Sequence, residues 1–91
     1  MRIDYVARNF ELDGRLRSQA EKKLEKLMKF LAAPVEARLG VSQDKFRFTC
    51  DLHVSHRGGD LHSNVEIHDA AESIDLAFAG VEEQAKRTRK K

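Results

Sequence analysis

The sequence is poor in the residues that mark secreted, metal-bound and membrane proteins. Its one cysteine, Cys50, cannot form an internal disulfide, and there is no Cys-x-x-Cys pair to suggest a structural zinc site. No apolar run approaches the roughly 20 residues that cross a bilayer. The opening residues also lack the apolar segment of a signal peptide. We therefore expect a cytoplasmic protein with no membrane partner.

The motifs of the common enzyme classes are missing as well. The chain has no GxSxG, P-loop, GxGxxG or HExxH sequence. Gly58 and Gly59 stand between two predicted strands and open no helix, so they lack the geometry that holds a phosphate. Cys50 falls on the inward side of its predicted strand, where a free cysteine acts as a small apolar residue. We expect no enzyme activity, no catalytic residue, no cofactor and no small-molecule substrate.

Alternation of apolar and polar residues predicts four half-buried strands. They cover residues 2–8, 35–42, 46–55 and 61–68. The inward-facing series of the third strand begins at Phe46. The last two strands are expected to form a hairpin around Gly58 and Gly59.

Apolar residues at helical spacing predict two helices. The first begins at the N-cap Asp13, carries a leucine stripe that reaches Leu31 and ends before Pro34. The second carries an apolar stripe from Ala71 to Ala85 and runs to the basic C-terminus; it contains Gly80, which is expected on the flank of the stripe. The order strand, helix, three strands, helix predicts an α+β fold. It consists of a four-stranded sheet with two helices packed side by side on one face, in a single domain spanning the whole chain.

The four histidines lie in or beside the predicted hairpin. If Val54 pairs with Leu61, then His53 lies opposite His62 on the solvent-exposed face of the sheet. A metal could use that pair, but a zinc site needs more than two ligands, and the pattern places no third one. We therefore expect polar surface residues here and no metal site.

The small net charge of +2 conceals an uneven distribution. Residues 14–31 and the last six residues are strongly basic, whereas in residues 36–83 the acidic side chains outnumber the basic ones. Basic residues of the first helix fall opposite its leucine stripe; they are Arg15, Lys22, Lys26 and Lys29. For them a solvated face and a phosphate-binding surface both remain open, although the sorting of charges by sign disfavours simple solvation. The C-terminal cations exceed what a helix dipole favours and point to a polyanionic partner.

Several motifs spread along the chain resemble one protein family, the ribosome hibernation promoting factors, also called ribosome-associated inhibitor or sigma-54 modulation proteins. The motifs are Asn9-x-Glu11-Leu12, Leu16-Arg17, Lys22-Lys23-Leu24-x-Lys26-Leu27, Leu52-His53-Val54, Gly58-Gly59-Asp60-Leu61-His62, Asp69, Ile74-Asp75-Leu76-Ala77 and Gln84. The resemblance implies that the paired helices place basic residues on the RNA of the small ribosomal subunit, in the channel for mRNA and tRNA. Occupying that channel would block translation.

The resemblance also implies which residues contact RNA. By motif position these are Lys23, Lys26, Lys29, Arg87 and Lys91. Local charge alone adds Lys22, Lys86, Arg89 and Lys90. The expected partner is the small ribosomal subunit and its RNA, and we expect the protein to bind as a monomer.

The chain departs from the family pattern at three positions in or near its second helix. Ala71 replaces a usual aromatic, Gly80 replaces a common lysine, and Glu83 replaces a frequent arginine. Restoring the positive charges at positions 80 and 83 is expected to tighten RNA binding. Because the sequence ends at Lys91, it also lacks the extra C-terminal domain of long family members, and we expect no pairing of ribosomes without another factor.

Three other functions remain open from the sequence. A double-stranded RNA-binding module is the main alternative, since helices on a sheet can follow the shape and phosphates of a duplex. A protein–protein modulator of transcription is suggested by the family's older name. A metal-dependent enzyme is the most distant possibility.

Overall fold

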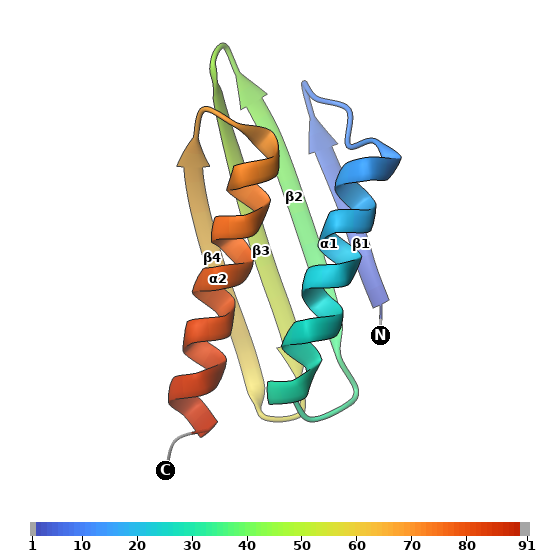
Figure 1. The fold of residues 1–91 in the computed structure, drawn as a ribbon, viewed down its shortest axis with the longest axis vertical. Helices are drawn as coiled ribbons and strands as arrows, with labels where there is room; N and C mark the ends of the chain where they lie inside the picture. Colours follow the sequence, from blue (N-terminus) through green and yellow to red (C-terminus); the bar gives the residue numbers. More distant parts are fainter. Residues whose placement is uncertain (1, 90–91) are drawn as a thin grey trace.

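The structure is a computed structural model that describes residues 2–89, with side chains described for residues 2–87. In chain order the elements are β1 (Arg2–Arg8), α1 (Gly14–Leu27), the short 3₁₀ helix η1 (Met28–Phe30), β2 (Glu36–Asp44), β3 (Arg47–His56), β4 (Gly59–Ile67) and α2 (Ala70–Arg89). Figure 1 shows the arrangement. The predicted α+β fold and element order are confirmed.

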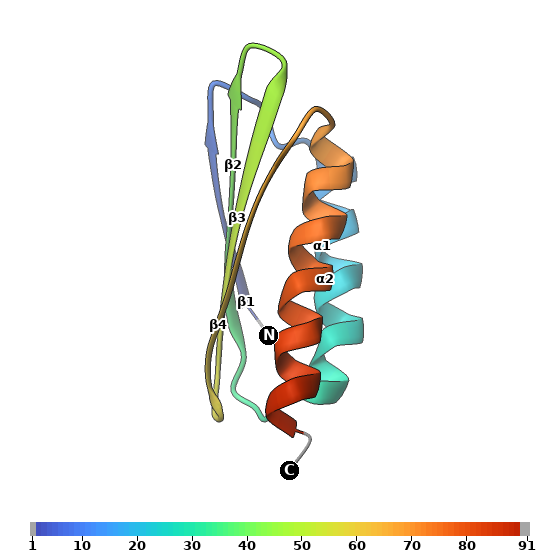
Figure 2. The same cartoon turned by 90° about the vertical axis from the view of Figure 1, so that its left-hand side faces the viewer.

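The four strands form one sheet in the order β1-β2-β3-β4. β1 runs parallel to β2, and the other two pairs are antiparallel. Parallel neighbours need a long crossover connection, which α1 provides. Both helices cover the same face of the sheet, so the molecule has one helical layer and one sheet layer (Figure 2). Neither helix is long and apolar enough, within the described residues, to cross a membrane.

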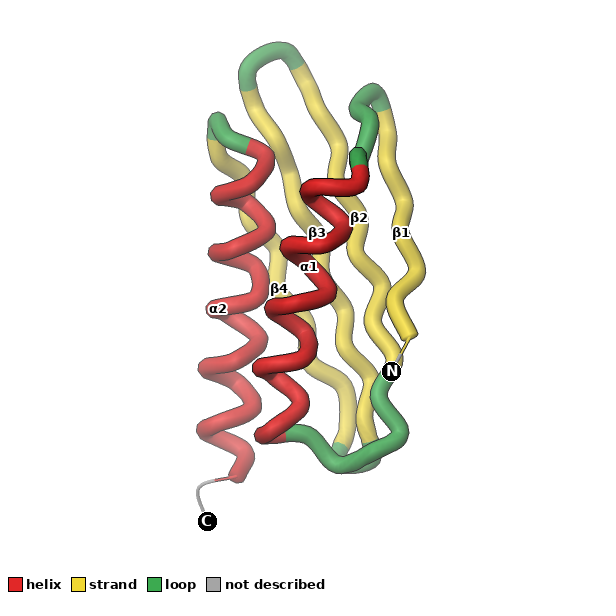
Figure 3. Tube along the Cα trace, turned by 45° about the vertical axis from the view of Figure 1, so that its right-hand side comes forward, coloured by secondary structure: helices red, strands yellow, loops and turns green. Residues whose placement is uncertain are grey.

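The hydrophobic core lies between these two layers. Alternate strand residues such as Leu39 and Leu52 are fully buried, and they meet Leu24 of α1 and Ile74 of α2. The opposite face of the sheet carries no helix in the described part of the chain (Figure 3). This confirms the predicted assignment of one apolar and one polar face to each central strand.

The first helix begins as predicted and ends earlier than its apolar stripe suggests. Asp13 caps it, because the Asp13 side chain accepts a hydrogen bond from the Leu16 backbone N–H at 3.0 Å. The α-helix ends at Leu27 and tightens into η1. Leu31, which was expected in the helix, has extended dihedral angles, since the chain turns there toward β2. Its side chain still packs against the core.

The two antiparallel hairpins differ in how well the sequence predicted them. In the β3–β4 hairpin Val54 pairs with Leu61, and His53 then lies opposite His62 as predicted. In the β2–β3 hairpin, Phe46 was expected to be the first inward-facing residue of a strand, and this was wrong. β3 begins only after Phe46, which lies in the turn and is 84% exposed. Lys45 beside it has a positive φ of 57°. A lysine in the sequence gives no indication of this conformation, which is uncommon for residues other than glycine.

Candidate nucleic-acid interface

The side of α1 and η1 that faces away from the sheet is lined with lysines. Lys22, Lys26 and Lys29 are exposed, whereas Leu24 and Leu27 on the other side are buried. The separation follows from helical geometry, since residues three and four apart share a face. Among the described side chains, no carboxylate forms an ion pair with these three lysines. Their charges are therefore available to an external anion.

Lys23 differs from its neighbours because it is only partly exposed and is already paired. Its Nζ lies 3.3 Å from Asp75 Oδ1 on α2. Gln19 Nε2 donates to the same carboxylate at 2.8 Å and to the Ala71 carbonyl at 2.9 Å. These contacts join the two helices side by side, with an acidic group between them.

The cations near the end of α2 also have acidic partners. Lys86 Nζ lies 3.3 Å from Glu82 and Arg87 Nη2 lies 3.2 Å from Glu83, each one helical turn away. Both pairs are exposed to solvent, where such interactions contribute little. A phosphate could therefore compete for either cation.

Both groups of cations lie at the same end of the helical layer. The helices run in the same direction, so their C-terminal ends lie together (Figure 1). Lys86 Nζ lies 5.3 Å from the centre of the Phe30 ring of η1, which links the two ends directly. Arg89 belongs to α2, but its side chain lies outside the described residues, as do Lys90 and Lys91 entirely.

Two shallow hollows mark this surface. One, of about 440 Å³, is lined by polar and basic side chains without a carboxylate; they are Arg15, Ser18, Gln19, Lys22, Lys23 and Lys26. The other, of about 210 Å³, lies between the helices and adds acidic groups to its lining; its residues are Lys23, Lys26, Leu27, Asp75, Phe78, Ala79 and Glu82. The first suits an anion better than the second. The acids of the second were not predicted, because their position depends on how the helices pack.

Gly80 lies close to β4. A side chain there was expected to reach solvent or RNA, and it would first have to displace the Ser63 hydroxyl. A Cβ atom at position 80 would lie 2.7 Å from Ser63 Oγ and 3.4 Å from Ser63 Cβ on β4. Glycine therefore allows α2 to approach β4 closely. Glu83 is exposed, as expected.

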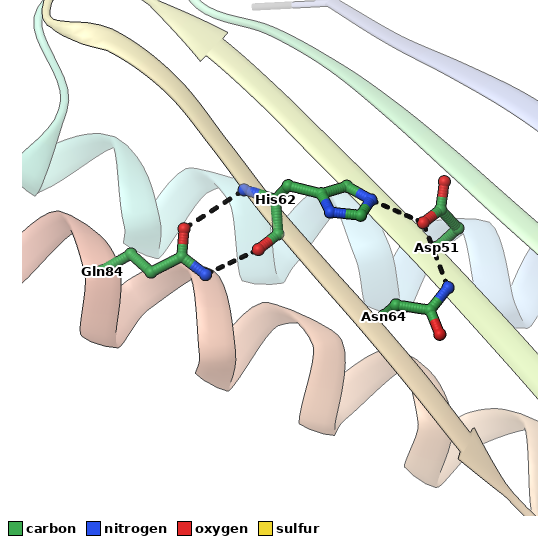
Figure 4. Close-up of polar contacts among 4 residues, drawn as sticks. All are labelled: Asp51, His62, Asn64 and Gln84. Atoms are coloured by element: carbon green, nitrogen blue, oxygen red, sulfur yellow. Dashed lines mark hydrogen bonds and ion pairs between the residues drawn. The ribbon is translucent and has the colours of Figure 1, made fainter.

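The exposed face of the sheet holds a small polar network (Figure 4). His62 Nε2 lies 2.7 Å from Asp51 Oδ1, and Asn64 Nδ2 donates to the same oxygen at 3.2 Å. The hydrogen bond from Asn64, together with His62, lowers the pKa of the Asp51 carboxyl. Gln84 of α2 accepts a hydrogen bond from the His62 backbone N–H and donates to the His62 carbonyl, which ties α2 to β4.

This network offers no site for a metal ion. In residues 2–89, no three histidine, cysteine or acidic side chains are placed so as to hold one. His53 lies near His62, with ring centres 6.3 Å apart, and its Nε2 is 3.9 Å from Asp60. These histidines form surface pairs with acids.

Cys50 lies in the core and is unsuited to nucleophilic chemistry. It is fully buried, and this burial, with a smaller effect of Asp51, raises the pKa of its thiol to about 12. At neutral pH the group stays protonated, whereas a nucleophilic cysteine must be a thiolate. Its role is packing.

The chain is similar to proteins of one known family. The family model described as sigma 54 modulation protein / S30EA ribosomal protein matches residues 3–91. The N-terminal domain of Protein Y from Thermus thermophilus is 28% identical with a TM-score of 0.88, and the match covers 96% of this chain and 98% of that one. A ribosomal subunit interface protein from Coxiella burnetii is 21% identical with a TM-score of 0.83, and all of both chains is covered. At that identity the second likeness shows the fold alone.

A search of curated proteins found no significant match. The family model nevertheless covers almost the entire chain. This protein therefore belongs to the sigma 54 modulation and S30EA ribosomal protein family, a family of ribosome-associated factors.

Proposed function

We propose that this protein is a hibernation factor that binds the RNA of the small ribosomal subunit in the channel for mRNA and tRNA, and so blocks translation. One observation carries the proposal: the outward side of the helical layer presents lysines without acidic partners among the described residues, beside the cations of α2. The sheet supports this layer from behind. The proposed action takes place in the cytoplasm, needs no chemical step, and uses the chain as a monomeric single domain.

The cations have different parts in the proposed contact. Lys22, Lys26 and Lys29 can approach phosphates without first breaking an ion pair. Lys23, Lys86 and Arg87 would have to exchange a carboxylate for a phosphate. Exposed pairs of this kind are worth about 0–1 kcal/mol, so the exchange is cheap. The proposal also assigns phosphate contacts to Arg89, Lys90 and Lys91, whose side chains lie outside the described residues.

The family model supports the same partner. It matches residues 3–91 and includes a ribosomal protein in its description. A phosphate-rich surface suits the lysine-lined hollow on α1, because each phosphate contact releases bound counterions and so favours binding at low salt.

The test is cosedimentation of the purified chain with small ribosomal subunits over a range of salt concentrations. A variant with Lys22, Lys26 and Lys29 all changed to Ala should bind more weakly, and its log-log salt slope should fall in magnitude by about 0.7 to 0.9 per lost contact. The matched control changes three cations of the β1–β2 region, Arg2, Arg8 and Arg38, to Ala. Its slope should stay close to that of the wild type.

Two further measurements separate the alternatives. Added mRNA and tRNA should compete with the protein, since the proposal places all three in one channel. A chain that bound bare RNA duplex as tightly as subunits would instead be a double-stranded RNA-binding module. Failure of the wild-type chain to cosediment at low salt, with subunits in excess, would remove the proposed function.

A further inference from the structure

Phe46 is the most exposed large hydrophobic residue of the described chain. It is 84% exposed at the tip of the β2–β3 hairpin, whereas the other phenylalanines lie in the core or pack against it. In Figure 1 the hairpin extends beyond the ends of the neighbouring elements, so no other segment covers its tip. An aromatic side chain in this position buries little area within the fold, so its ring is accessible to a partner outside the chain.

The backbone of the turn holds this side chain outward. Asp44 pairs with Arg47 to close the hairpin, and Lys45 between them has a φ of 57°. That conformation is unfavourable for a residue with a Cβ atom. Gln43 Nε2 donates to the Lys45 carbonyl at 3.2 Å within the turn. The tip therefore projects from the sheet and carries an aromatic ring.

Cations flank the ring on both sides in the sequence. Lys45 is exposed in the turn, and Arg47 lies exposed at the start of β3, where its Nε is 3.5 Å from Glu66. A ring between cations suits single-stranded RNA, because unpaired bases stack on aromatic side chains while their phosphates attract basic ones. A purely apolar pocket on a protein partner would suit the ring less well, because both cations would lose water without gaining an anionic partner.

The tip lies far from the lysines of the helical layer. The molecule is 42 Å long, and the hairpin tip stands at the opposite end from the C-terminal ends of α1 and α2 (Figure 1). A contact at the tip would therefore be separate from the proposed phosphate surface. Two contacts at opposite ends would also fix the direction in which the protein lies along its RNA.

We propose that Phe46 stacks on an unpaired base of ribosomal RNA, with Lys45 and Arg47 on the adjoining phosphates. This inference rests on the proposed function, since it assigns a second contact to the same complex. It concerns residues that lie outside the helical layer and that no basic motif of the sequence includes.

Affinity for small ribosomal subunits tests the stacking contact. Phe46→Ala should weaken binding about 5- to 150-fold, which corresponds to about 1–3 kcal/mol for one stacked base. Phe46→Trp should retain wild-type affinity, because it keeps a stacking surface. The matched control is Val6→Ala, which shortens another exposed hydrophobic residue, 48% exposed on β1, and should change nothing. All three variants should keep the wild-type melting temperature, because neither residue belongs to the buried core.

The contacting partner is then identified by crosslinking. A photoreactive benzoyl-phenylalanine placed at position 46 should label ribosomal RNA when the subunit complex is irradiated. Crosslinks confined to ribosomal proteins would overturn the inference. So would wild-type affinity of Phe46→Ala in a preparation where the triple lysine variant binds weakly, and that result would leave the proposed function standing. If the wild-type chain does not bind subunits at all, both proposals fail.

Discussion

Lys23 Nζ lies 3.3 Å from Asp75 Oδ1, and this ion pair joins α1 to α2 at the smaller of the two hollows, the one between the helices. Gln19 strengthens the junction with hydrogen bonds to Asp75 and to the Ala71 carbonyl. An acid thus stands among cations that we propose bind phosphate, and it neutralises one of them. The junction connects the two helices, and in the proposed complex it would weaken their attraction for RNA.

Changing Asp75 to Asn should tighten binding to small subunits at low salt. Two unit charges 4 Å apart in water interact by about 1 kcal/mol, which corresponds to about fivefold in affinity. Asn can still accept the hydrogen bond from Gln19, and loss of an exposed ion pair should change stability by no more than about 1 kcal/mol. The control is Asp4→Asn, which breaks the exposed Arg2–Asp4 pair on β1. Weaker binding by the Asp75 variant would show instead that the pair positions Lys23 for its contact.

Changing His62 to Ala should leave both ribosome binding and stability almost unchanged. The residue lies on the exposed face of the sheet, away from the proposed RNA surface, and its pair with Asp51 is exposed. We expect a loss of at most about 1 kcal/mol in the free energy of unfolding, measured with denaturant. His53→Ala should likewise leave ribosome binding and stability almost unchanged. Stoichiometric zinc in the purified protein, lost in either variant together with a large fall in melting temperature, would show a metal site after all.

Changing Gly80 to Ala should stabilise the protein only when Ser63 is also changed to Ala. Alanine favours a helix over glycine by about 1 kcal/mol, but its Cβ would lie 2.7 Å from Ser63 Oγ. In a Ser63→Ala background the gain of about 1 kcal/mol should be recovered, because the hydroxyl is gone. Denaturant unfolding of both single variants and the double variant measures this coupling. An equal effect of Gly80→Ala in the two backgrounds would mean that Ser63 simply rotates away.

The sequence predicted those parts of the fold that depend on local pattern. Alternation in the strands and the short connection at Gly58 predicted the hairpin in which Val54 pairs with Leu61. Asp13 predicted the start of α1, because an N-cap is a local hydrogen bond. The exposed lysines of α1 followed in the same way from helical spacing.

What the sequence did not predict depends on packing between distant segments or on backbone strain. The Lys23–Asp75 pair and the approach of Gly80 to Ser63 arise only once α2 is placed against α1 and β4. Phe46 fitted the alternation of β3, and nothing in Lys45 indicated that its φ would be positive. Glycine or asparagine would have signalled such a turn.

The stability of the protein should fall above about pH 9 through the ionisation of Cys50. Burial raises the pKa of this thiol from 9.0 to about 12, so the folded state keeps a proton that the unfolded state loses. The stabilisation is therefore complete below pH 9 and is lost as the pH rises toward 12, by about 1.4 kcal/mol per pH unit. Comparison with Cys50→Ala, unfolded in denaturant at each pH, isolates this group. A constant difference between the two proteins from pH 8 to 11 would contradict the prediction.

Changing Glu83 to Arg should tighten binding to small subunits. Glu83 is exposed and pairs with Arg87 at 3.2 Å, so the substitution adds a cation and releases a second one. If both contact phosphates, the log-log salt slope should steepen by about 1.4 to 1.8. Stability should fall only by about 0.2–0.5 kcal/mol, because arginines one turn apart repel each other.

The matched control for this charge reversal is Glu36→Arg, an equal change at an exposed position of β2. It should gain much less affinity, since β2 belongs to the layer that faces away from the proposed RNA surface. Gly80→Lys is not a suitable partner for Glu83→Arg, because Ser63 stands in the way of its side chain. If Glu83→Arg binds no better than the control at low salt, α2 does not face RNA. The proposed phosphate surface would then consist of the lysines of α1 and η1 alone.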